Sequence, residues 1–393
     1  MNLQINKIVT LYVINMIFLD NNSTTQIDPR VLKEIIPYFN QKYGNPSSNS
    51  HKFGWEANDA IDISRKKISN LINSSPNEII FTSGATESNN LAISGYFNKN
   101  NFNNCNIITS NIEHRAILDV YHIIKKKYEN SVRLVLCNDE GLINKTSIEK
   151  MIDSNTVLIS IMHANNEIGT IQPIKQIGAL CKQNNIIFHV DAAQSLGKIK
   201  IDVKEMNIDL LSISSHKIYG PKGIGALYIN KQIKNSLNPI LVGGGQENGM
   251  RAGTLPTPLI VGFGKAAEIS NIEMEKETKN ILKMRKIITD GILNSFKNSL
   301  VNGSLDKRIA GNINFTFPFL NGMSIINSVS DIAISNGSAC SSSSSKPSHV
   351  LTALGRNKKE AISSCRIGIG RFNTINEINI ALDSIIKTLK VKS

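Results

Sequence analysis

The sequence predicts an α/β protein in which helices cover both faces of a mostly parallel sheet and a smaller α+β domain follows. Two observations support this class. Short apolar runs alternate along the chain with segments of helical period, which is the pattern of parallel sheets with crossover helices. The 393 residues, of which 41% are hydrophobic and 19% charged, are enough for two or three domains with a large buried core.

The expected elements of the large domain follow from these patterns. Apolar runs of strand length lie at 79–81, 132–136, 157–162, 186–190 and 210–214. Segments with apolar residues at helical spacing lie at 55–72, 87–97, 117–128 and 174–183. Open sheets of this kind bind ligands at the carboxyl ends of their strands, so the polar residues after each strand are the first candidates for a site.

A glycine-rich stretch at 243–254 breaks the alternation and leads into the second part of the chain. There we expect a long charged helix at 266–296, a strand at 312–317, a serine-rich loop at 338–345 and a helix at 378–389. The expected large domain is 27–265, and the expected small domain combines 16–26 with 266–393. Residues 1–15 form an extension of unknown role, with Met16 as an alternative start. The serine run also has the composition of a flexible linker.

Composition argues against several classes of function. No apolar run approaches the roughly 20 residues that span a bilayer, so an integral membrane protein is excluded. The 44 Lys and Arg exceed the 31 Asp and Glu by 13, but the sharpest basic run, Lys125–Lys127, lies mostly off the apolar face of its helix. We therefore expect a solvated face and no specific nucleic-acid binding. Five irregularly spaced cysteines argue against a disulfide framework or a metal site and favour a reducing compartment, the cytoplasm or an organelle matrix.

Two charged residues stand at the ends of successive predicted strands. Asp191 follows the strand at 186–190, and Lys217 follows the strand at 210–214, just before a Gly-Pro turn. Taken singly, the acid is more typical of a helix cap and the lysine of a surface. Together they fit pyridoxal phosphate (PLP), because a shielded amine forms a Schiff base with its aldehyde and a carboxylate stabilises its protonated ring nitrogen.

A PLP site also needs a place for the phosphate. The turn at 82–87 follows a strand and begins a helix. Backbone N–H groups, hydroxyls and the helix dipole at such a turn suit a phosphate. An N-cap at Ser83 or Thr86 is the alternative interpretation of the same residues.

Seven motifs in order carry a resemblance over nearly the whole chain, from about Phe18 to the end. They are FTSGATES (81–88), EHRAI (113–117), MHANNEIG (162–169), HVDAAQS (189–195), SHKIYGPKGIGALY (215–228), RAGTLPTP (251–258) and NGSACSSSSSKPSHVL (336–351). With these motifs the chain resembles the cysteine desulfurases of the NifS/IscS type, PLP-dependent enzymes of fold type I in the class V aminotransferase family. The resemblance implies a large domain with a mostly parallel, seven-stranded type of sheet and a smaller α+β domain.

The resemblance also implies the ligands of the cofactor. Lys217 holds PLP as a Schiff base, Asp191 pairs with the ring nitrogen, and His114 stacks on the ring. Further implied contacts are Gln194 and Asn166 at the ring-hydroxyl edge, and Ala85, Thr86, Ser214, His216 and Thr254 at the phosphate. Thr254 is expected to reach the phosphate of the partner subunit, which implies a homodimer with shared active sites.

The implied reaction converts L-cysteine to L-alanine. Arg366 clamps the substrate carboxylate, with Asn45 and Asn166 as further substrate contacts. Lys217 acts as the base at Cα, and Cys340 attacks the substrate sulfur and keeps it as a persulfide, with His114 as a proton relay. The sulfur is expected to feed iron–sulfur cluster assembly and, as an additional destination, tRNA thiolation.

Some features depart from the family pattern, and alternatives stay open. Lys346 adds positive charge near Cys340, which bears on its thiol pKa or on the choice of partner. The chain ends soon after its last helix, which puts in doubt the docking of an iron–sulfur scaffold protein on a longer tail. The alternatives are a selenocysteine lyase or another fold-type I enzyme, and a non-catalytic binding or regulatory subunit. The intact set of catalytic residue types argues against the last.

Overall fold

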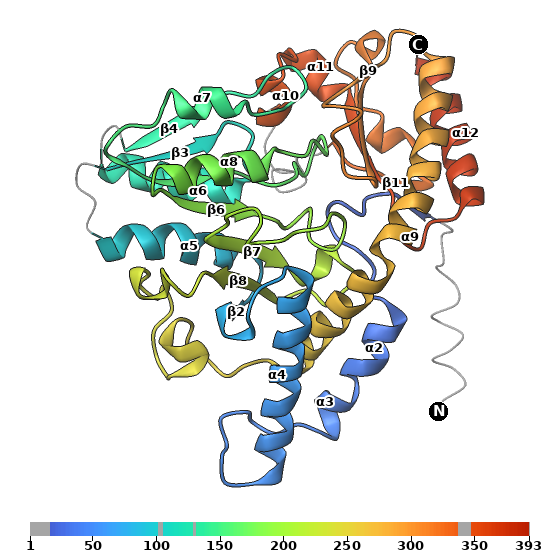
Figure 1. The fold of residues 1–393 in the computed structure, drawn as a ribbon. Coiled ribbons are helices and arrows are strands. Elements are labelled where there is room, and N and C mark those ends of the chain that lie inside the picture. The colour runs from blue at the N-terminus through green and yellow to red at the C-terminus, as the bar shows by residue number, and fades with distance from the viewer. Residues whose placement is uncertain (1–15, 101–104, 129–130, 337–346, 393) are drawn as a thin grey trace, which may run out of the picture.

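The centre of the fold is a mixed sheet of seven strands (Figure 1). The computed structural model describes residues 16–100, 105–128, 131–336 and 347–392. In spatial order the strands are β2 (Ile79–Thr82), β8 (Gly225–Ile229), β7 (Leu210–Ser214), β6 (Ile187–Asp191), β5 (Thr156–Ser160), β3 (Asn106–Ser110) and β4 (Val132–Val135). Neighbours from β7 to β4 run parallel, whereas β8 runs antiparallel to both β2 and β7. The expected mostly parallel sheet is confirmed.

Helices cover both faces of this sheet, as Figure 1 shows. Successive strand residues point to opposite faces, so in β2 the side chain of Phe81 enters one core and that of Ile80 the other. The first core is closed by α4 (Lys52–Leu71), α7 (Lys145–Glu149), α8 (Ile174–Gln183) and the first part of α9 (Thr257–Ser295). The second core is closed by α5 (Ala85–Asn100) and α6 (Arg115–Lys127). Burial on both faces explains why the strands read as continuous apolar runs.

A second, smaller sheet lies toward the C-terminal end of α9 (Figure 1). Its antiparallel strands are, in spatial order, β12 (Ser364–Gly368), β10 (Asn312–Thr316) and β9 (Leu300–Val301). Together with the later part of α9 and with α12 (Ile375–Lys392) they enclose a separate apolar core. Near it, β1 (Ile17–Phe18) pairs in parallel with β11 (Ile332–Ala333), which brings the first described residues against a segment more than 300 positions later.

Short helices complete the described chain. They are α2 (Pro29–Ile35), α3 (Pro37–Asn40), α10 (His349–Ala353) and α11 (Lys358–Ile362). Within the described ranges no helix combines the length and the apolar character needed to cross a membrane.

Several elements were not predicted, among them β12 and the short helices, and two further differences concern the cores of the fold. The long helix α9 begins at Thr257 instead of residue 266, because Pro256 precedes it and Pro258 suits its first turn, so one helix contributes to both the first core and the small-sheet core. The strands β3 and β8 are not among the predicted ones. Both are fully buried, and their neighbours in the sheet, which sequence periodicity does not reveal, complete their hydrogen bonding.

Candidate active site

A pocket of about 460 Å³ opens at the carboxyl ends of β6 and β7. These strands are neighbours in the sheet, with Asp191 opposite Ser212. Asp191 is the last residue of β6, Ser214 is the last of β7, and Lys217 follows in a 3-10 turn, Ser215–Lys217. All three line the pocket, so the topology brings together the acid and the amine that the sequence separates by 26 positions.

The amine of Lys217 is held by the N-terminal segment of the chain. Its Nζ donates to the backbone carbonyl of Asn22 at 2.7 Å and to that of Ser23. Asn22 also binds Gln194, whose Nε2 donates to the Asn22 carbonyl at 2.8 Å. The segment after β1 therefore forms one wall of the pocket. Its residues Asn22 and Ser23 were not among the predicted site residues. Its polar run Asp20–Thr25, directly after an apolar strand, is the signal that could have found it.

Asp191 is arranged as a hydrogen-bond acceptor. Its carboxylate accepts from the Ala193 N–H at Oδ1 and from the Asn89 side chain at Oδ2, both at 2.9 Å. The residue is almost completely buried. A buried carboxylate fixed by two neutral donors can accept a hydrogen bond from a protonated ring nitrogen, and this is the acceptor that a PLP ring requires.

The turn between β2 and α5 forms the end of the pocket suited to a phosphate. Residues Ser83 to Glu87 line the pocket, and α5 begins at Ala85. The first N–H groups of a helix lack intrahelical partners, and the positive end of its dipole favours an anion. The Glu87 carboxylate is engaged in other contacts, because it accepts from the Ser83 N–H at 2.7 Å and pairs with Arg251 at 2.9 Å.

His216 lies beside the same part of the pocket as a neutral ring. Burial, together with the charges of Lys217 and Lys222, lowers the pKa of His216 to about 4. Its Nδ1 lies 3.0 Å from the Thr24 hydroxyl. At neutral pH the ring can therefore hydrogen-bond to a phosphate without adding a full charge.

His114 combines a cap with a place in the pocket. Its Nδ1 accepts from the Ala116 N–H at 3.1 Å and caps α6, and its ring lines the pocket. An acceptor at Nδ1 places the proton of the neutral ring on Nε2. His114 can therefore cap α6 and present its ring to the pocket at the same time.

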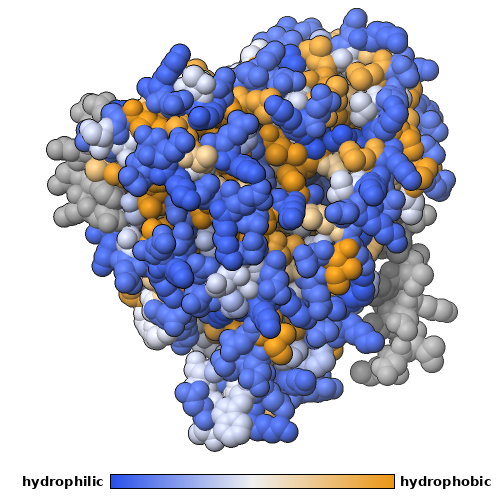
Figure 2. All heavy atoms as spheres, viewed as in Figure 1, coloured by the Kyte–Doolittle hydropathy of each residue, from blue (hydrophilic) through white to orange (hydrophobic). Residues whose placement is uncertain are grey.

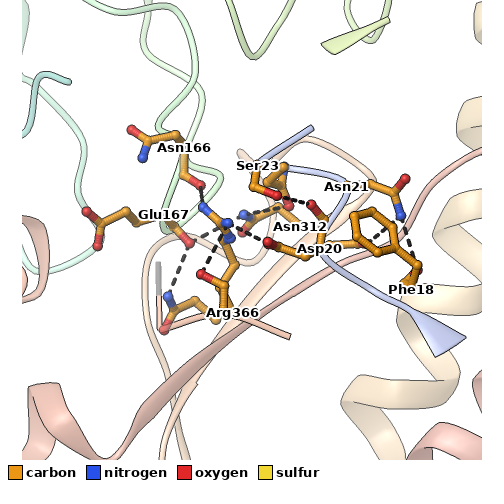
Figure 3. Close-up of polar contacts among 12 residues, drawn as sticks. Phe18, Asp20, Asn21, Ser23, Asn166, Glu167, Asn312 and Arg366 are labelled. Atoms are coloured by element: carbon orange, nitrogen blue, oxygen red, sulfur yellow. Dashed lines mark hydrogen bonds and ion pairs between the residues drawn. The ribbon is translucent and has the colours of Figure 1, made fainter. Parts of the chain in front are cut away.

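Arg366 is not a surface ion pair, because only 2% of the residue is exposed. It projects from β12 into the junction between the two sheets, where Figure 3 shows its guanidinium between Asp20 and Asn166. Nη2 pairs with Asp20 at 2.6 Å, and Nη1 donates to the Asn166 carbonyl at 2.8 Å. A guanidinium fixed in this way presents a permanent positive charge to the pocket that it lines.

Several further residues that line the pocket were not predicted, among them Ser348, His349 and Glu167. Ser348 donates to the Glu167 carboxylate at 2.5 Å, and His349 Nε2 lies 2.9 Å from the backbone oxygen of Glu113. These contacts join the start of α10 to the loops that follow β3 and β5. Glu167 follows Asn166 in the motif MHANNEIG, so its position beside a predicted site residue was an available signal.

Glu113 is a fully buried acid directly before His114. Both of its carboxyl oxygens lie 3.0 Å from the Met162 nitrogen, and Oε1 lies 2.5 Å from the Ser110 hydroxyl. Burial, with a smaller contribution from the negative charge of Asp191, raises the pKa of Glu113 to about 8. The hydrogen bonds of this carboxyl join the ends of β3 and β5, and its raised pKa favours the protonated, uncharged form.

This buried acid predicts a pH-dependent stability. The folded-state pKa of about 8 exceeds the ordinary 4.5, so the stabilisation is complete below pH 4.5 and is lost as the pH rises toward 8. The Glu113→Gln variant should gain on the wild type over this window by on the order of a few kcal/mol in unfolding free energy. Denaturant unfolding at both ends of the window measures it, with the exposed Glu149→Gln as control. Parallel pH profiles for wild type and Glu113→Gln would contradict the protonated acid.

The other predicted site residues divide into three groups. Ala85, Thr86, Asn166, Gln194, Ser214 and His216 line the pocket together with Lys217, Asp191, His114 and Arg366. Asn45 and Thr254 are exposed and are not among the described residues that line it. Cys340 and Lys346 lie outside the described residues.

Comparisons with known families and solved structures assign the chain to one class of proteins. The class-V aminotransferase family matches residues 17–380. Two solved structures share the fold: a NifS-like protein with a TM-score of 0.88, 35% identity and coverage of 96% of this chain and 100% of its own, and a protein described as SspA in complex with cysteine, with a TM-score of 0.80, 38% identity and coverage of 91% and 99%. The chain thus has the fold of a PLP-dependent enzyme of class V.

Curated relatives narrow this class. The mitosomal cysteine desulfurase of Encephalitozoon cuniculi is 46% identical over 95% of this chain and 87% of its own length. The cysteine desulfurase IscS of Rickettsia bellii is 47% identical over 98% of this chain and 92% of its own. The chain belongs to the cysteine desulfurases of the class-V aminotransferase family, which use PLP.

Proposed function

We propose that this chain converts L-cysteine to L-alanine and retains the sulfur as a persulfide on Cys340. The observation that carries the proposal is the convergence of Lys217, Asp191, His114 and Arg366 on one pocket, from strand ends and loops far apart in the sequence. Family membership adds the reaction class. The selenocysteine lyase and non-catalytic alternatives are not favoured, because the relatives named above are cysteine desulfurases.

The residues of the pocket fit PLP. Lys217 would hold its aldehyde carbon, Asp191 its ring nitrogen, His114 one ring face and Gln194 the ring hydroxyl. The turn at 83–87, Ser214 and His216 would hold its phosphate. When bound, PLP supplies an electron sink for the Cα of an amino acid.

The protein's own residues supply binding and proton transfer. Arg366, fixed by Asp20 and Asn166, would bind the substrate carboxylate and orient its side chain. The Lys217 amine, held among the carbonyls of the N-terminal segment, lies in the pocket as a base for the Cα proton. His114 carries a ring proton on Nε2, and we assign it as the relay for the substrate thiol.

Cys340 is the thiol we assign to the attack. Its thiolate would bond to the substrate sulfur while the C–S bond breaks, leaving the electron pair on the carbon skeleton, which takes up protons to become alanine. The other cysteines suit this step poorly. Burial raises the thiol pKa of Cys105, Cys137 and Cys181, and that of Cys365 to about 12, so little thiolate forms on them at neutral pH.

A homodimer is the proposed state. Aromatic side chains from α3 to the start of α4 are exposed, among them Tyr43 at 67% and Trp55 at 53%, on a segment that protrudes at the bottom of Figure 1. The face in Figure 2 is mostly hydrophilic, with hydrophobic residues in small groups, so several large exposed aromatics on one segment are unusual. A second copy that covers this segment would also bring its own exposed Thr254 and Asn45 toward the pocket of the first copy.

The wider role is proposed from the relatives. Sulfur from Cys340 would supply iron–sulfur cluster assembly through a scaffold protein, and tRNA thiolation as a second outlet. The relatives are bacterial and mitosomal, so the proposed compartment is the cytoplasm or an organelle matrix. We also propose a large domain over 27–265 and a small domain from 16–26 and 266–393.

The test of the proposed function is product stoichiometry. With PLP, L-cysteine and a thiol reductant, the wild type is expected to release alanine and sulfide in equal amounts, because each persulfide formed is reduced once. Parallel assays with L-selenocysteine separate the alternatives. Turnover of selenocysteine alone would support the lyase, and bound PLP without turnover of either substrate would support the non-catalytic subunit.

A further inference from the structure

The glycine-rich loop between β8 and α9 is anchored to the large domain by one buried carboxylate. Only 1% of the Glu247 side chain is exposed, and its two oxygens pair with Arg65 of α4 at 2.7 Å and 2.9 Å. The backbone N–H of Phe81 in β2 donates to Oε2 at 2.7 Å. Arg65 also donates to the Ile79 carbonyl and stacks on the Phe81 ring. The loop is therefore attached to the strand that leads into the phosphate turn.

The backbone at this anchor has an uncommon conformation. Glu247 and Asn248 have φ values of 50° and 55°, in the left-handed region that non-glycine residues rarely adopt. Two consecutive residues in this region are costly, and such strain persists only where the surroundings hold it. The three hydrogen bonds to the Glu247 carboxylate provide that hold.

The same turn orients the rest of the loop. Gln246, the neighbour of Glu247, accepts from the Gly253 N–H at Oε1 over 3.0 Å, one residue before Thr254. Arg251 pairs with Glu87 at 2.9 Å, and Glu87 binds the Ser83 N–H of the phosphate turn. The loop is thus fixed to its own subunit on both sides of the turn, while Thr254 stays exposed to the outside.

We infer that Glu247 is a positioning residue that acts in trans: it holds the glycine-rich loop so that Thr254 completes the phosphate site of the partner subunit. The inference rests on the proposed homodimer with shared sites. Its rival is a role in cis, in which Glu247 only supports β2 and the phosphate turn of its own subunit. The two roles place the defect of a Glu247 variant in different active sites.

Mixed dimers with a single competent Lys217 separate the two roles. In the first arrangement, one chain carries both Lys217→Ala and Glu247→Gln and its partner is wild type, so the competent site receives the altered loop. In the second, Lys217→Ala and Glu247→Gln are on different chains, so the competent site receives an unaltered loop. The readout is the PLP concentration needed for half-maximal absorbance of the lysine-bound cofactor, which reports the competent site only.

The first arrangement is expected to need at least about tenfold more PLP than a dimer with Lys217→Ala alone, a loss typical of one anion contact. The second should stay close to that reference. Thr254→Val, at an exposed position, should show the same asymmetry. Glu78→Gln is the matched control, because Glu78 is a buried carboxylate beside β2 that binds the N–H groups of Ser75 and Lys231 instead of the loop.

Equal losses in both arrangements, or a loss confined to the second, would overturn the inference. If Thr254→Val shows the asymmetry and Glu247→Gln does not, the shared site stands and the positioning role fails. Sedimentation of the wild-type holoenzyme checks the premise, since a monomeric mass would overturn the homodimer and the trans role together. A thermal melt of each mixed dimer keeps a folding defect distinct from a loss of PLP affinity.

Discussion

Replacing Lys217 by Ala is expected to abolish alanine formation from L-cysteine and to remove the absorbance of the lysine-bound cofactor. The amine is the group that we assign both to the aldehyde of the cofactor and to the base in the pocket. Loss of a positioned base alone costs about 10²- to 10⁴-fold in rate, and here the cofactor attachment is lost as well. The measurement is alanine release together with the absorbance spectrum of the purified protein.

Cys340→Ser is the matched partner of this experiment. It removes the thiol that we assign to sulfur transfer and leaves Lys217 in place, so the cofactor spectrum should persist while alanine and sulfide formation fall to background. Cys365→Ser is the control, because Cys365 is fully buried with a raised thiol pKa and should be dispensable for turnover. Full activity of Cys340→Ser would contradict the persulfide assignment and indicate that another thiol accepts the sulfur.

Changing Arg366 to Lys is expected to raise the KM for L-cysteine about 100-fold, because a lysine retains the charge but not the two-pronged geometry that binds a carboxylate. A lysine also cannot keep both guanidinium contacts, to Asp20 and to the Asn166 carbonyl, so a loss of stability of about 2 kcal/mol is expected beside it. Steady-state kinetics with saturating PLP measure the first effect, and denaturant unfolding measures the second.

Arg371→Lys distinguishes the two effects of the Arg366 change. Arg371 also forms buried ion pairs, with Asp28 and Glu277 at 2.8 Å each, and stacks on Tyr219, but it is not among the described residues that line the pocket. This variant should lose stability in a similar way and keep its KM. If Arg366→Lys keeps its KM as well, Arg366 is a structural residue at the junction of the two sheets, and the substrate carboxylate binds elsewhere.

The pattern of the sequence was enough to predict most of the large sheet and the positions of Asp191 and Lys217 at its edge. Apolar runs and helical spacing located most strands and helices to within a few residues, because burial on both faces of a parallel sheet leaves a strong signal. Asp191 and Lys217 could be placed at neighbouring strand ends for the same reason. The strands β3 and β8 and the true start of α9 escaped, since their limits depend on neighbours in the sheet and on two prolines rather than on period.

The sequence by itself determined the class of fold, the family and the residue types of the chemistry, because these depend on local periodicity and on motifs of a few residues. Only the tertiary structure decided which distant segments meet. It placed Asn22 and Ser23 against Lys217, Asp20 against Arg366, and Ser348 against Glu167. It also buried Glu113, which raises the pKa of its carboxyl, and it made Glu247 the anchor of the glycine-rich loop. These contacts join residues far apart in the chain, and the burial that sets their charge arises only when both sheets and their helices pack together.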